Sequence, residues 1–341
     1  MRVSSTGSAE PVVDVGIPAW GRPRYVVEAI ESILSQTFER WRLHVSEDGP
    51  GGGEVQAAVE PYLADPRISY SATGGSLGAP RNKTLLIQKG DSPFVGLLDD
   101  DDHWRPDFLR RRVEFLEAHR ECGFVFSPIV VVDEQGRELE RSAPLVAGGV
   151  HRSEEFVPRL LRRPGGLPGT TFVVRRSAYE AVGQEFDVDL PRTYDYEMWL
   201  RLAVRFPVGY LTVWDAAWRR HPARSSADVN GLEEEYSRLV GRMSALIATE
   251  QPRAQLSRRG WRWKRAGWLL SAALDALDVG DRAGALSCLA RALQTSPRAL
   301  ADPRVPAVLA AFLLGEPGRR AVVGLRAAAH RKRAHRTAGN E

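Results

Sequence analysis

The chain changes from apolar to acidic within the segment Phe94-Val95-Gly96-Leu97-Leu98-Asp99-Asp100-Asp101-Asp102-His103-Trp104-Arg105-Pro106. Its apolar start predicts a buried strand over Phe94 to Leu98, and a helix is expected to begin near Pro106. Four adjacent carboxylates repel one another, so ending a buried strand in this way is costly unless a cation lies nearby. Carboxylate oxygens suit Mg²⁺ or Mn²⁺, which can also bridge a diphosphate. The segment therefore predicts a metal site beside a phosphorylated ligand, and the alternative is a solvated acidic turn that caps the following helix.

Strand-like and helix-like patterns alternate at short spacing through the first third of the chain. Strands are expected over Val12–Pro18, Trp41–Ser46 and Ile68–Ser71, and helices over Arg24–Thr37, Glu54–Leu63 and Pro80–Lys89. This alternation predicts an α/β fold, with a mostly parallel sheet flanked by helices. Because ligands of such sheets bind at the carboxyl ends of the strands, the functional residues are expected just after strands.

The rest of the chain is less regular and then becomes helical. We expect a hairpin of Phe124–Asp133 with Arg137–Glu140, a strand over Thr170–Val174 and a helix over Thr193–Phe206. Beyond Gly231, the helical pair Trp261–Leu277 and Arg282–Leu293 resembles a single tetratricopeptide-like hairpin. The predicted division is a disordered N-terminus (1–10), an α/β domain (11–225), a linking helix (226–252), an all-α hairpin region (253–317) and a basic tail (318–341).

The overall composition excludes several classes of protein. The 341 residues contain no apolar run near the ~20 residues of a membrane-spanning helix, and the polar N-terminus does not resemble a signal peptide. Cys122 and Cys288 lie far apart, which fits a reduced, cytoplasmic protein and excludes a disulfide framework. Residues 253–341 contain 17 Lys and Arg against 6 Asp and Glu, whereas residues 1–252 contain 30 against 37. This asymmetry indicates an anionic partner for the C-terminal part.

A glycine-rich stretch, Gly74 to Ala79, precedes the helix expected to begin at Pro80. It would bring Arg81 and Lys83 to a helix N-terminus that can bind phosphate, although such turns are also common without a ligand. The first expected strand ends in Pro18-Ala19-Trp20-Gly21-Arg22 without a G-x-G-x-x-G pattern. That absence argues against a nicotinamide-dependent enzyme.

Five motifs in this order resemble the family 2 inverting glycosyltransferases of GT-A fold, over about Val12 to Arg224. They are Ile17–Arg22, Ala29–Thr37, Glu47-Asp48-Gly49, Gly78–Asn82 and Leu98–Asp102. The resemblance implies a Rossmann-like nucleotide-sugar fold, a nucleotide-diphospho-sugar donor and a Mn²⁺ or Mg²⁺ cofactor. The chain departs from the family's usual residues at Trp20-Gly21, at Glu47 and at Pro50, and these positions bear on the identity of the base and the sugar.

The same resemblance implies roles for individual residues. Pro18, Ala19 and Trp20 would border the nucleobase, with Arg22 in the same nucleotide-sugar site. Asp48 or Glu47 would bind the uracil or ribose side, Arg81 the nucleotide and Asp100 the ribose. Asp99 and Asp101 would form the metal-binding D-x-D motif, with His221 as a further metal ligand. Arg219 and Arg220 would neutralise the diphosphate.

An acidic helix start, Tyr194 to Arg201, resembles the part of the family that supplies the catalytic base. An inverting transfer needs a carboxylate that takes the proton of the acceptor, and Asp195 is the first candidate with Glu197 the second. The alternative is that Asp195 only caps its helix. The predicted function is metal-dependent inverting transfer, with a UDP-sugar as the expected donor and an unknown acceptor. A sugar nucleotidyltransferase and a non-catalytic scaffold are the alternatives.

The basic C-terminal part has three interpretations. It packs or forms a homodimer, it grips an acceptor or partner protein, or Arg319 to Arg336 lie on an anionic membrane surface at the inner face of the membrane. Nucleic-acid binding is not expected, because no aromatic residues are interleaved with the basic ones. The apolar residues of the hairpin are expected to be buried, namely Trp261, Trp268, Leu269, Leu270, Leu286 and Leu289.

Overall fold

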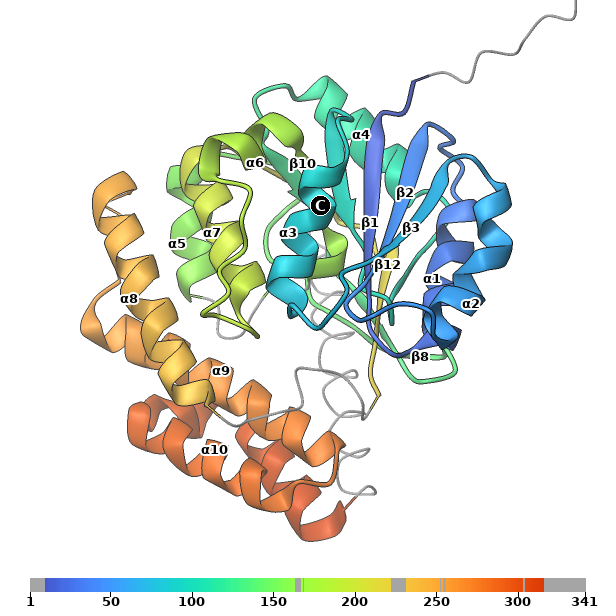
Figure 1. Ribbon diagram of the computed structural model, residues 1–341. Coiled ribbons are helices and arrows are strands. Elements are labelled where there is room, and N and C mark those ends of the chain that lie inside the picture. Colours follow the sequence, from blue (N-terminus) through green and yellow to red (C-terminus); the bar gives the residue numbers. More distant parts are fainter. Residues whose placement is uncertain are drawn as a thin grey trace, which may run out of the picture.

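A parallel four-stranded unit forms one half of the main sheet in the computed structural model, which describes residues 10–162, 167, 169–221, 231–251, 253, 256–302 and 304–315. The strands β1 (Val13–Ala19), β2 (Trp41–Glu47), β3 (Ile68–Ala72) and β4 (Phe94–Leu97) lie in the order β3-β2-β1-β4. They alternate with α1 (Pro23–Leu34), α2 (Glu54–Val59) and α3 (Ala79–Lys89), while a 3₁₀ turn (Glu60–Ala64) follows α2 (Figure 1). The α/β fold expected from the alternation is confirmed.

The second half of the main sheet is mixed in direction. The strands β10 (Val173–Arg175), β6 (Phe124–Phe126), β11 (Val208–Tyr210) and β9 (Gly149–His151) follow β4 in that order. β10 runs antiparallel to both β4 and β6, and β11 is parallel to β6. Thr170 and Thr171, expected as the start of a strand over Thr170–Val174, instead belong to a 3₁₀ turn, Gly169–Thr171.

A second, four-stranded sheet lies beside the end of β4. It contains β5 (His103–Trp104), β12 (Ala216–Arg219), β7 (Val130–Val132) and β8 (Glu138–Arg141) in that order. The hairpin of β7 and β8 is confirmed, but the expectation of one strand over Phe124–Asp133 is wrong. The chain breaks at Ser127-Pro128, and the two halves join different sheets. Proline has no N–H for a ladder hydrogen bond, which explains the interruption.

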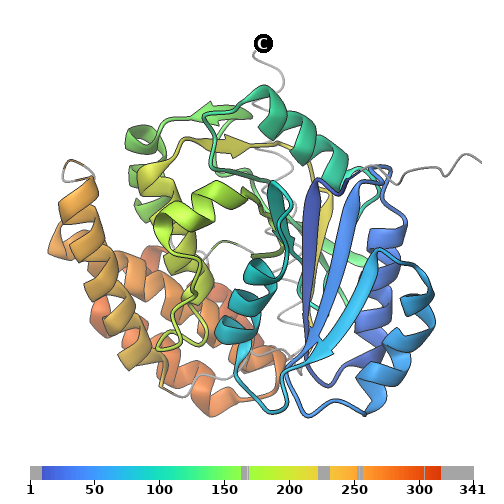
Figure 2. The same cartoon turned by 45° about the horizontal axis from the view of Figure 1, so that its top comes forward.

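Both faces of the main sheet are covered by helices. Along β6, Phe124 and Phe126 belong to one apolar cluster and Val125 to the other, as the twofold alternation of a strand requires. The first cluster contains side chains of α3, α5 (Ser153–Arg162) and α7 (Tyr194–Arg205), and the second those of α1 and α4 (Phe108–Ala118). In Figure 2, α1 and α2 lie on the opposite side of the parallel strands from α3. The short helix α6 (Arg176–Val182) follows β10.

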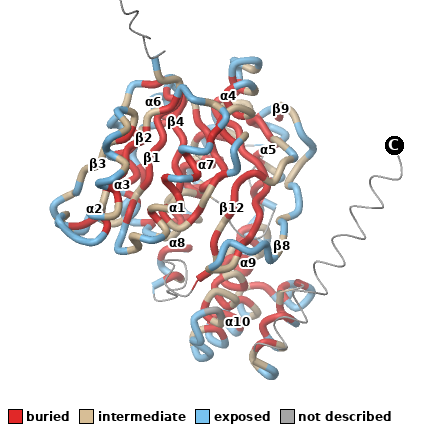
Figure 3. The backbone as a smooth tube through the Cα atoms, turned by 90° about the vertical axis from the view of Figure 1, so that its right-hand side faces the viewer, coloured by how far each residue is buried: buried red, intermediate tan, exposed pale blue. Residues whose placement is uncertain are grey.

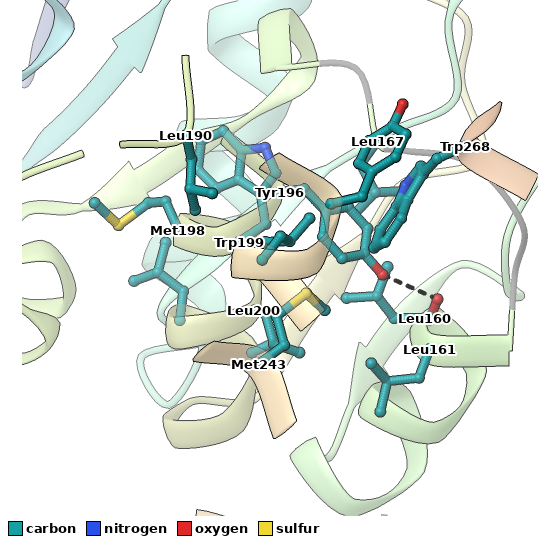
Figure 4. Packing of buried hydrophobic residues seen from close by; sticks show 14 of the residues in the cluster. Leu160, Leu161, Leu167, Leu190, Tyr196, Met198, Trp199, Leu200, Met243 and Trp268 are labelled. Atoms are coloured by element: carbon teal, nitrogen blue, oxygen red, sulfur yellow. Dashed lines mark hydrogen bonds between the residues drawn. The ribbon is translucent and has the colours of Figure 1, made fainter. Parts of the chain in front are cut away.

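The C-terminal helices extend the first apolar cluster. The helices α8 (Leu232–Glu250), α9 (Arg258–Asp278) and α10 (Arg282–Thr295) are followed by a 3₁₀ turn, Pro297–Ala301. In Figure 4, Met243 of α8 and Trp268 of α9 lie next to α7 side chains, and Figure 3 shows buried residues continuing into this region. Five of the six apolar hairpin residues are buried as expected, but Leu286 is 38% exposed. Residues 1–9 and 318–341, expected as a disordered start and a basic tail, lie outside the described residues, and the domain boundaries stay predictions.

No helix in the described part of the chain combines the length and the apolar character needed to cross a membrane.

Candidate active site

The four aspartates lie in the short connection between β4 and β5, at the carboxyl end of the parallel strands. The Asp102 N–H donates to the Asp99 carbonyl at 3.0 Å, so the four residues form a tight turn that spreads their side chains. Asp100 and Asp101 share one cation, whereas Asp99 and Asp102 have partners of their own.

Asp100 and Asp101 share a cation that comes from the end of β1. Gly21 adopts a φ of 63°, which turns the chain after Trp20 and brings the Arg22 guanidinium to both carboxylates. The Trp20 N–H also donates to Asp100 at 2.9 Å. Burial raises the pKa of Asp100 to about 7, although the charge of Arg22 works against this. Arg22, expected to contact the nucleotide-sugar, therefore contacts the acidic turn.

Asp101 has a second partner in His221, whose Nε2 lies 2.9 Å from its Oδ2. Burial alone would raise the pKa of Asp101, but the His221 hydrogen bond and the Arg22 charge outweigh it and lower that pKa. Asp102 is buried and accepts from the Arg219 N–H at 2.9 Å. Burial raises the pKa of Asp102 well above its usual range, and the charges of Asp101 and Asp99 act in the same direction.

The expectation that Arg219 neutralises the diphosphate does not agree with the structure. Its side chain is buried, and its guanidinium donates to the carbonyls of Asp101 (2.9 Å) and Glu134 (3.0 Å) and to the carboxylate of Glu28. Arg219 thus ties the acidic turn to the rest of the fold. Arg220 is paired instead with Glu140 at 3.3 Å.

Asp99 is paired with Lys83 of α3, at 2.6 Å between Oδ1 and Nζ. The sequence places Lys83 near a phosphate, and the structure adds that it is buried between Asp99 and the helix α7. Its Nζ lies 5.2 Å from the centroid of the Tyr194 ring. Burial would lower the pKa of Lys83, but the charge of Asp99 outweighs it and raises that pKa. No sequence pattern identified this pairing, because the two residues are brought together by the packing of α3 against β1 and β4.

Asp195 lies in the first turn of α7, and its side chain approaches the Lys83 ammonium. A methyl group at Gly169 would lie 3.6 Å from Oδ2 of Asp195 and 4.0 Å from Nζ of Lys83, so these two side chains converge. The other oxygen, Oδ1, accepts from the Tyr196 N–H at 2.6 Å. Burial raises the pKa of Asp195 to about 6, against the opposing charge of Lys83.

Glu197, the second candidate for the base, is held elsewhere. It is buried, and its Oε2 accepts from Arg201, one turn along α7, at 2.9 Å. It lines a separate cavity of about 670 Å³ together with Gly183 to Val188 and Arg242. Two residues along a helix correspond to about 200°, which explains why Asp195 and Glu197 lie on different sides of α7.

The residues expected to bind the nucleotide border the ends of β1 and β2. Trp20 is 61% exposed, Pro18 is half-buried and Ala19 is buried. The Tyr70 hydroxyl donates to Glu47. Asp48 accepts the backbone N–H groups of Leu77 (2.6 Å) and Gly78 (2.9 Å).

Both oxygens of Asp48 therefore hold the glycine-rich loop, a structural role that differs from the expected contact with uracil or ribose. This loop leads into α3, where Gly78 has a φ of 84°. Arg81 follows in the first turn of α3, and its side chain is exposed.

The side chains expected as metal ligands have the donor atoms that a divalent cation binds. Asp99 and Asp101 offer carboxylate oxygens, and His221 offers a ring nitrogen. The positive charge of the Arg22 guanidinium already lies against the Asp101 carboxylate. In the described part of the chain, however, no three His, Cys, Asp or Glu side chains are gathered closely enough to hold a metal ion. A metal ion at these carboxylates would compete with Arg22 for Asp101 and with Lys83 for Asp99.

Comparisons with known proteins identify the family of the α/β part of the chain. Residues 14–183 match the model of the family "Glycosyl transferase family 2". A Methanocaldococcus jannaschii protein, the uncharacterized glycosyltransferase MJ1057, is 26% identical over 196 residues, which cover 56% of this chain and 64% of that protein. An Escherichia coli K12 protein named as a colanic acid biosynthesis glycosyl transferase, WcaA, is 24% identical over 202 residues, covering 58% of this chain and 67% of WcaA. The chain thus spans about two thirds of the length of these relatives.

A solved structure shares the fold over nearly the whole chain. The crystal structure of S. aureus TarS residues 1–349 in complex with UDP-GlcNAc has a TM-score of 0.60 and 15% sequence identity, and the match covers 92% of this chain and 90% of the TarS chain. This likeness shows the GT-A fold and extends into the C-terminal helices. The family match begins in β1, includes the acidic turn after β4 and ends after α6. Together with the curated relatives, it shows that the chain belongs to glycosyl transferase family 2.

Proposed function

We propose that this protein transfers a sugar from a nucleoside-diphospho-sugar, a UDP-sugar in the first instance, to an acceptor hydroxyl with inversion at the anomeric carbon. The observation that supports this most is the convergence of Asp195 with Lys83 beside the acidic turn. A carboxylate with a raised pKa then lies next to a buried cation, and the membership of family 2 supplies the reaction class.

Asp195 is the proposed general base. Its Oδ2 takes the proton of the acceptor hydroxyl while the hydroxyl oxygen forms a bond to the anomeric carbon. The bond from that carbon to the diphosphate oxygen breaks, and its electron pair leaves with the nucleoside diphosphate. Inversion follows because the acceptor attacks from the face opposite the leaving group. A pKa of about 6 suits the role, because Asp195 is then ionised at neutral pH yet basic enough to accept a proton.

The leaving diphosphate would be stabilised by cations of the chain. Arg81, exposed in the first turn of α3, would offer its guanidinium next to the N–H groups of that helix. Asp99, Asp101 and His221 would hold Mn²⁺ or Mg²⁺, which supplies positive charge to the departing diphosphate. Arg22 would then be released from Asp101 and become available to the nucleotide-sugar, as the sequence predicts.

The remaining expectations stay proposals. The acceptor, the homodimer through the C-terminal helices and the contact with an anionic membrane rest on the sequence alone. A cytoplasmic location is supported by the two cysteines, Cys122 and Cys288, which are free and buried. No observation favours the nucleotidyltransferase or the scaffold alternative over the transferase.

A donor screen with two matched variants tests the proposal. UDP- and GDP-sugars are incubated with the protein in Mn²⁺, Mg²⁺ or EDTA, and release of the nucleoside diphosphate is measured. We expect release from a UDP-sugar that EDTA abolishes and Mn²⁺ or Mg²⁺ restores. Asp195→Asn should lower turnover by roughly 10²–10⁴-fold with little change in donor binding.

Glu197→Gln is the control, because it alters a buried carboxylate of the same helix that faces Arg201. It should leave turnover near the wild-type value. If Glu197→Gln abolishes turnover and Asp195→Asn does not, the base is misassigned. Full turnover in EDTA would contradict the proposed dependence on a metal ion.

A further inference from the structure

The start of α7, which carries Asp195 in its first turn, contacts a side chain from the C-terminal helices. Glu235 of α8 is 1% exposed. Its Oε1 accepts the N–H groups of Arg192 and Thr193, both at 2.8 Å, and the Thr193 hydroxyl at 2.9 Å. Its Oε2 accepts the Arg192 guanidinium at 3.0 Å. One carboxylate thus holds the two residues that precede the first turn of α7.

This contact supports the start of the helix without capping its first turn, because Glu235 binds the N–H groups of Arg192 and of the N-cap residue Thr193. The first N–H groups of a helix have no partners within the helix, and a side chain at the N-cap position usually serves there. Thr193 occupies that position in α7 but makes no capping hydrogen bond with its own side chain. Glu235 holds this end of α7 from 42 residues further along the chain, and its negative charge suits the positive end of the helix dipole.

A second contact from the C-terminal helices lies on the other side of Asp195. The Lys264 ammonium of α9 donates to the Leu160 carbonyl at 3.1 Å and lies 4.4 Å from the centroid of the Tyr196 ring. The Tyr196 hydroxyl donates to the same carbonyl at 3.2 Å, and the Trp268 ring meets the Tyr196 ring edge-on at 5.5 Å (Figure 4). Tyr196 is therefore held on its own side of the first turn.

We propose that Glu235 is a positioning residue for the transfer reaction, and that the C-terminal helices complete the active site. Glu235 fixes the residues just before Asp195, while Lys264 and Trp268 fix the residue just after it. The carboxylate of Asp195 is thereby held in line with Lys83 and the acidic turn. This inference rests on the proposed function, because it needs Asp195 to be the base.

The test separates the reach of the Glu235 side chain from its charge. Glu235→Gln keeps an Oε1 acceptor for Arg192 and Thr193 but loses the charge. Glu235→Asp keeps the charge but shortens the side chain by one methylene, and Glu235→Ala removes the contact. Turnover and KM are measured with UDP-GlcNAc as the first donor probe, or with the UDP-sugar that gives most release in the screen.

We expect kcat to fall by up to about 10²-fold in Glu235→Ala, with KM for the donor nearly unchanged, because a small displacement of the base affects the reaction and not donor binding. Glu235→Asp should lie between Glu235→Ala and the wild type, and Glu235→Gln should recover most of kcat. If Glu235→Ala is insoluble, the kcat values of the other two variants still test the positioning role. A higher kcat for Glu235→Gln than for Glu235→Asp supports the role, and the reverse order contradicts it.

Leu239→Ala is the matched control. Leu239 is fully buried on α8, one turn beyond Glu235, so its truncation destabilises the same helix without removing a hydrogen bond to α7. We expect its kcat per folded molecule to equal the wild-type value. If Glu235→Ala and Leu239→Ala lower kcat equally, Glu235 is only structural and the inference is wrong.

The Asp195→Asn variant distinguishes a failure of the positioning role of Glu235 from a failure of the proposed function. An inactive Asp195→Asn with a fully active Glu235→Ala overturns only the positioning role. A fully active Asp195→Asn overturns the proposed base and, with it, the inference.

Discussion

The acidic turn after β4 and the start of α7 both bury carboxylates, but they balance the charge in different ways. At the turn, Asp99, Asp100 and Asp101 are met by the side-chain cations Lys83 and Arg22. At α7, Glu235 is met by two backbone N–H groups in addition to the Arg192 guanidinium and the Thr193 hydroxyl. A side-chain cation can move away and be replaced by a metal ion, whereas a backbone N–H is part of the chain and stays where the fold places it. The comparison separates an exchangeable charge balance, suited to ligand binding, from a permanent one, suited to positioning.

Removal of the helices that support α7 should have the largest effect. A chain ending after Thr249 lacks α9 and α10, so Tyr196 loses Lys264 and Trp268, and Tyr236 loses its stacked partner Trp268 at 5.2 Å. A newly exposed apolar surface of this kind favours aggregation. We expect little soluble protein and no cooperative thermal transition. A soluble, active truncated chain would show that the α/β part needs no support from these helices.

Loss of an exchangeable cation should have a smaller and conditional effect. Arg22→Ala leaves Asp100 and Asp101 facing each other without the guanidinium, which costs up to about 3 kcal/mol of unfolding free energy when a largely buried pair is broken. Because Mn²⁺ can then enter without displacing Arg22, we expect Mn²⁺ to raise the Tm of Arg22→Ala more than that of the wild type.

Arg22→Lys is the control for this measurement, since it keeps one charge but not the two-carboxylate bridge. Its Mn²⁺ response should lie between those of the wild type and Arg22→Ala. An equal rise in Tm for all three proteins would mean that Arg22 does not compete with a metal.

The proposed base should show its own pH dependence. Burial raises the pKa of Asp195 to about 6, and the base works only when it is deprotonated. The turnover rate should therefore be level above about pH 7, bend near pH 6 and fall about tenfold per unit below about pH 5. The residual rate of Asp195→Asn should not follow this curve. A wild-type rate that stays level down to pH 4 would indicate that another group accepts the proton.

Deletion of residues 319–341 should have the smallest effect on the folded protein. These residues contain seven Lys and Arg and lie outside the described part of the chain. If they bind an anionic membrane, the full chain should sediment with anionic liposomes at low salt, and the shortened chain should not. Turnover of a soluble donor should remain unchanged. A full chain that ignores such liposomes would leave packing or acceptor binding as the role of the basic part.

The elements of the first third of the fold were predictable to within a few residues. Their apolar periodicity is strong, and Pro80 and the glycine-rich loop mark where α3 begins. The run Phe124–Asp133 was misjudged because apolar residues alone do not reveal which of two sheets they join. Its break at Pro128 became evident only from the strand pairing.

The sequence predicted which residues lie at the candidate site, but it did not predict which side chains contact one another there. Arg219 has the residue type and the position of a phosphate ligand, yet it is buried and holds backbone carbonyls. Asp48 likewise holds the glycine-rich loop. The pairing of Lys83 with Asp99 and the contact of Glu235 with Thr193 were not predictable, because in each case the partners lie far apart in the sequence.

The sequence by itself determined the order of strands and helices in the first third of the chain, the four aspartates at the end of β4 and the family to which those motifs point. Local periodicity and residue type are sufficient for this, because they act within a few neighbours along the chain. Only the tertiary structure decided which cation meets which carboxylate, and that a glutamate of α8 holds the start of α7. Such pairings depend on how distant elements pack, since a buried charge is stabilised by whichever partner the fold brings within hydrogen-bond distance.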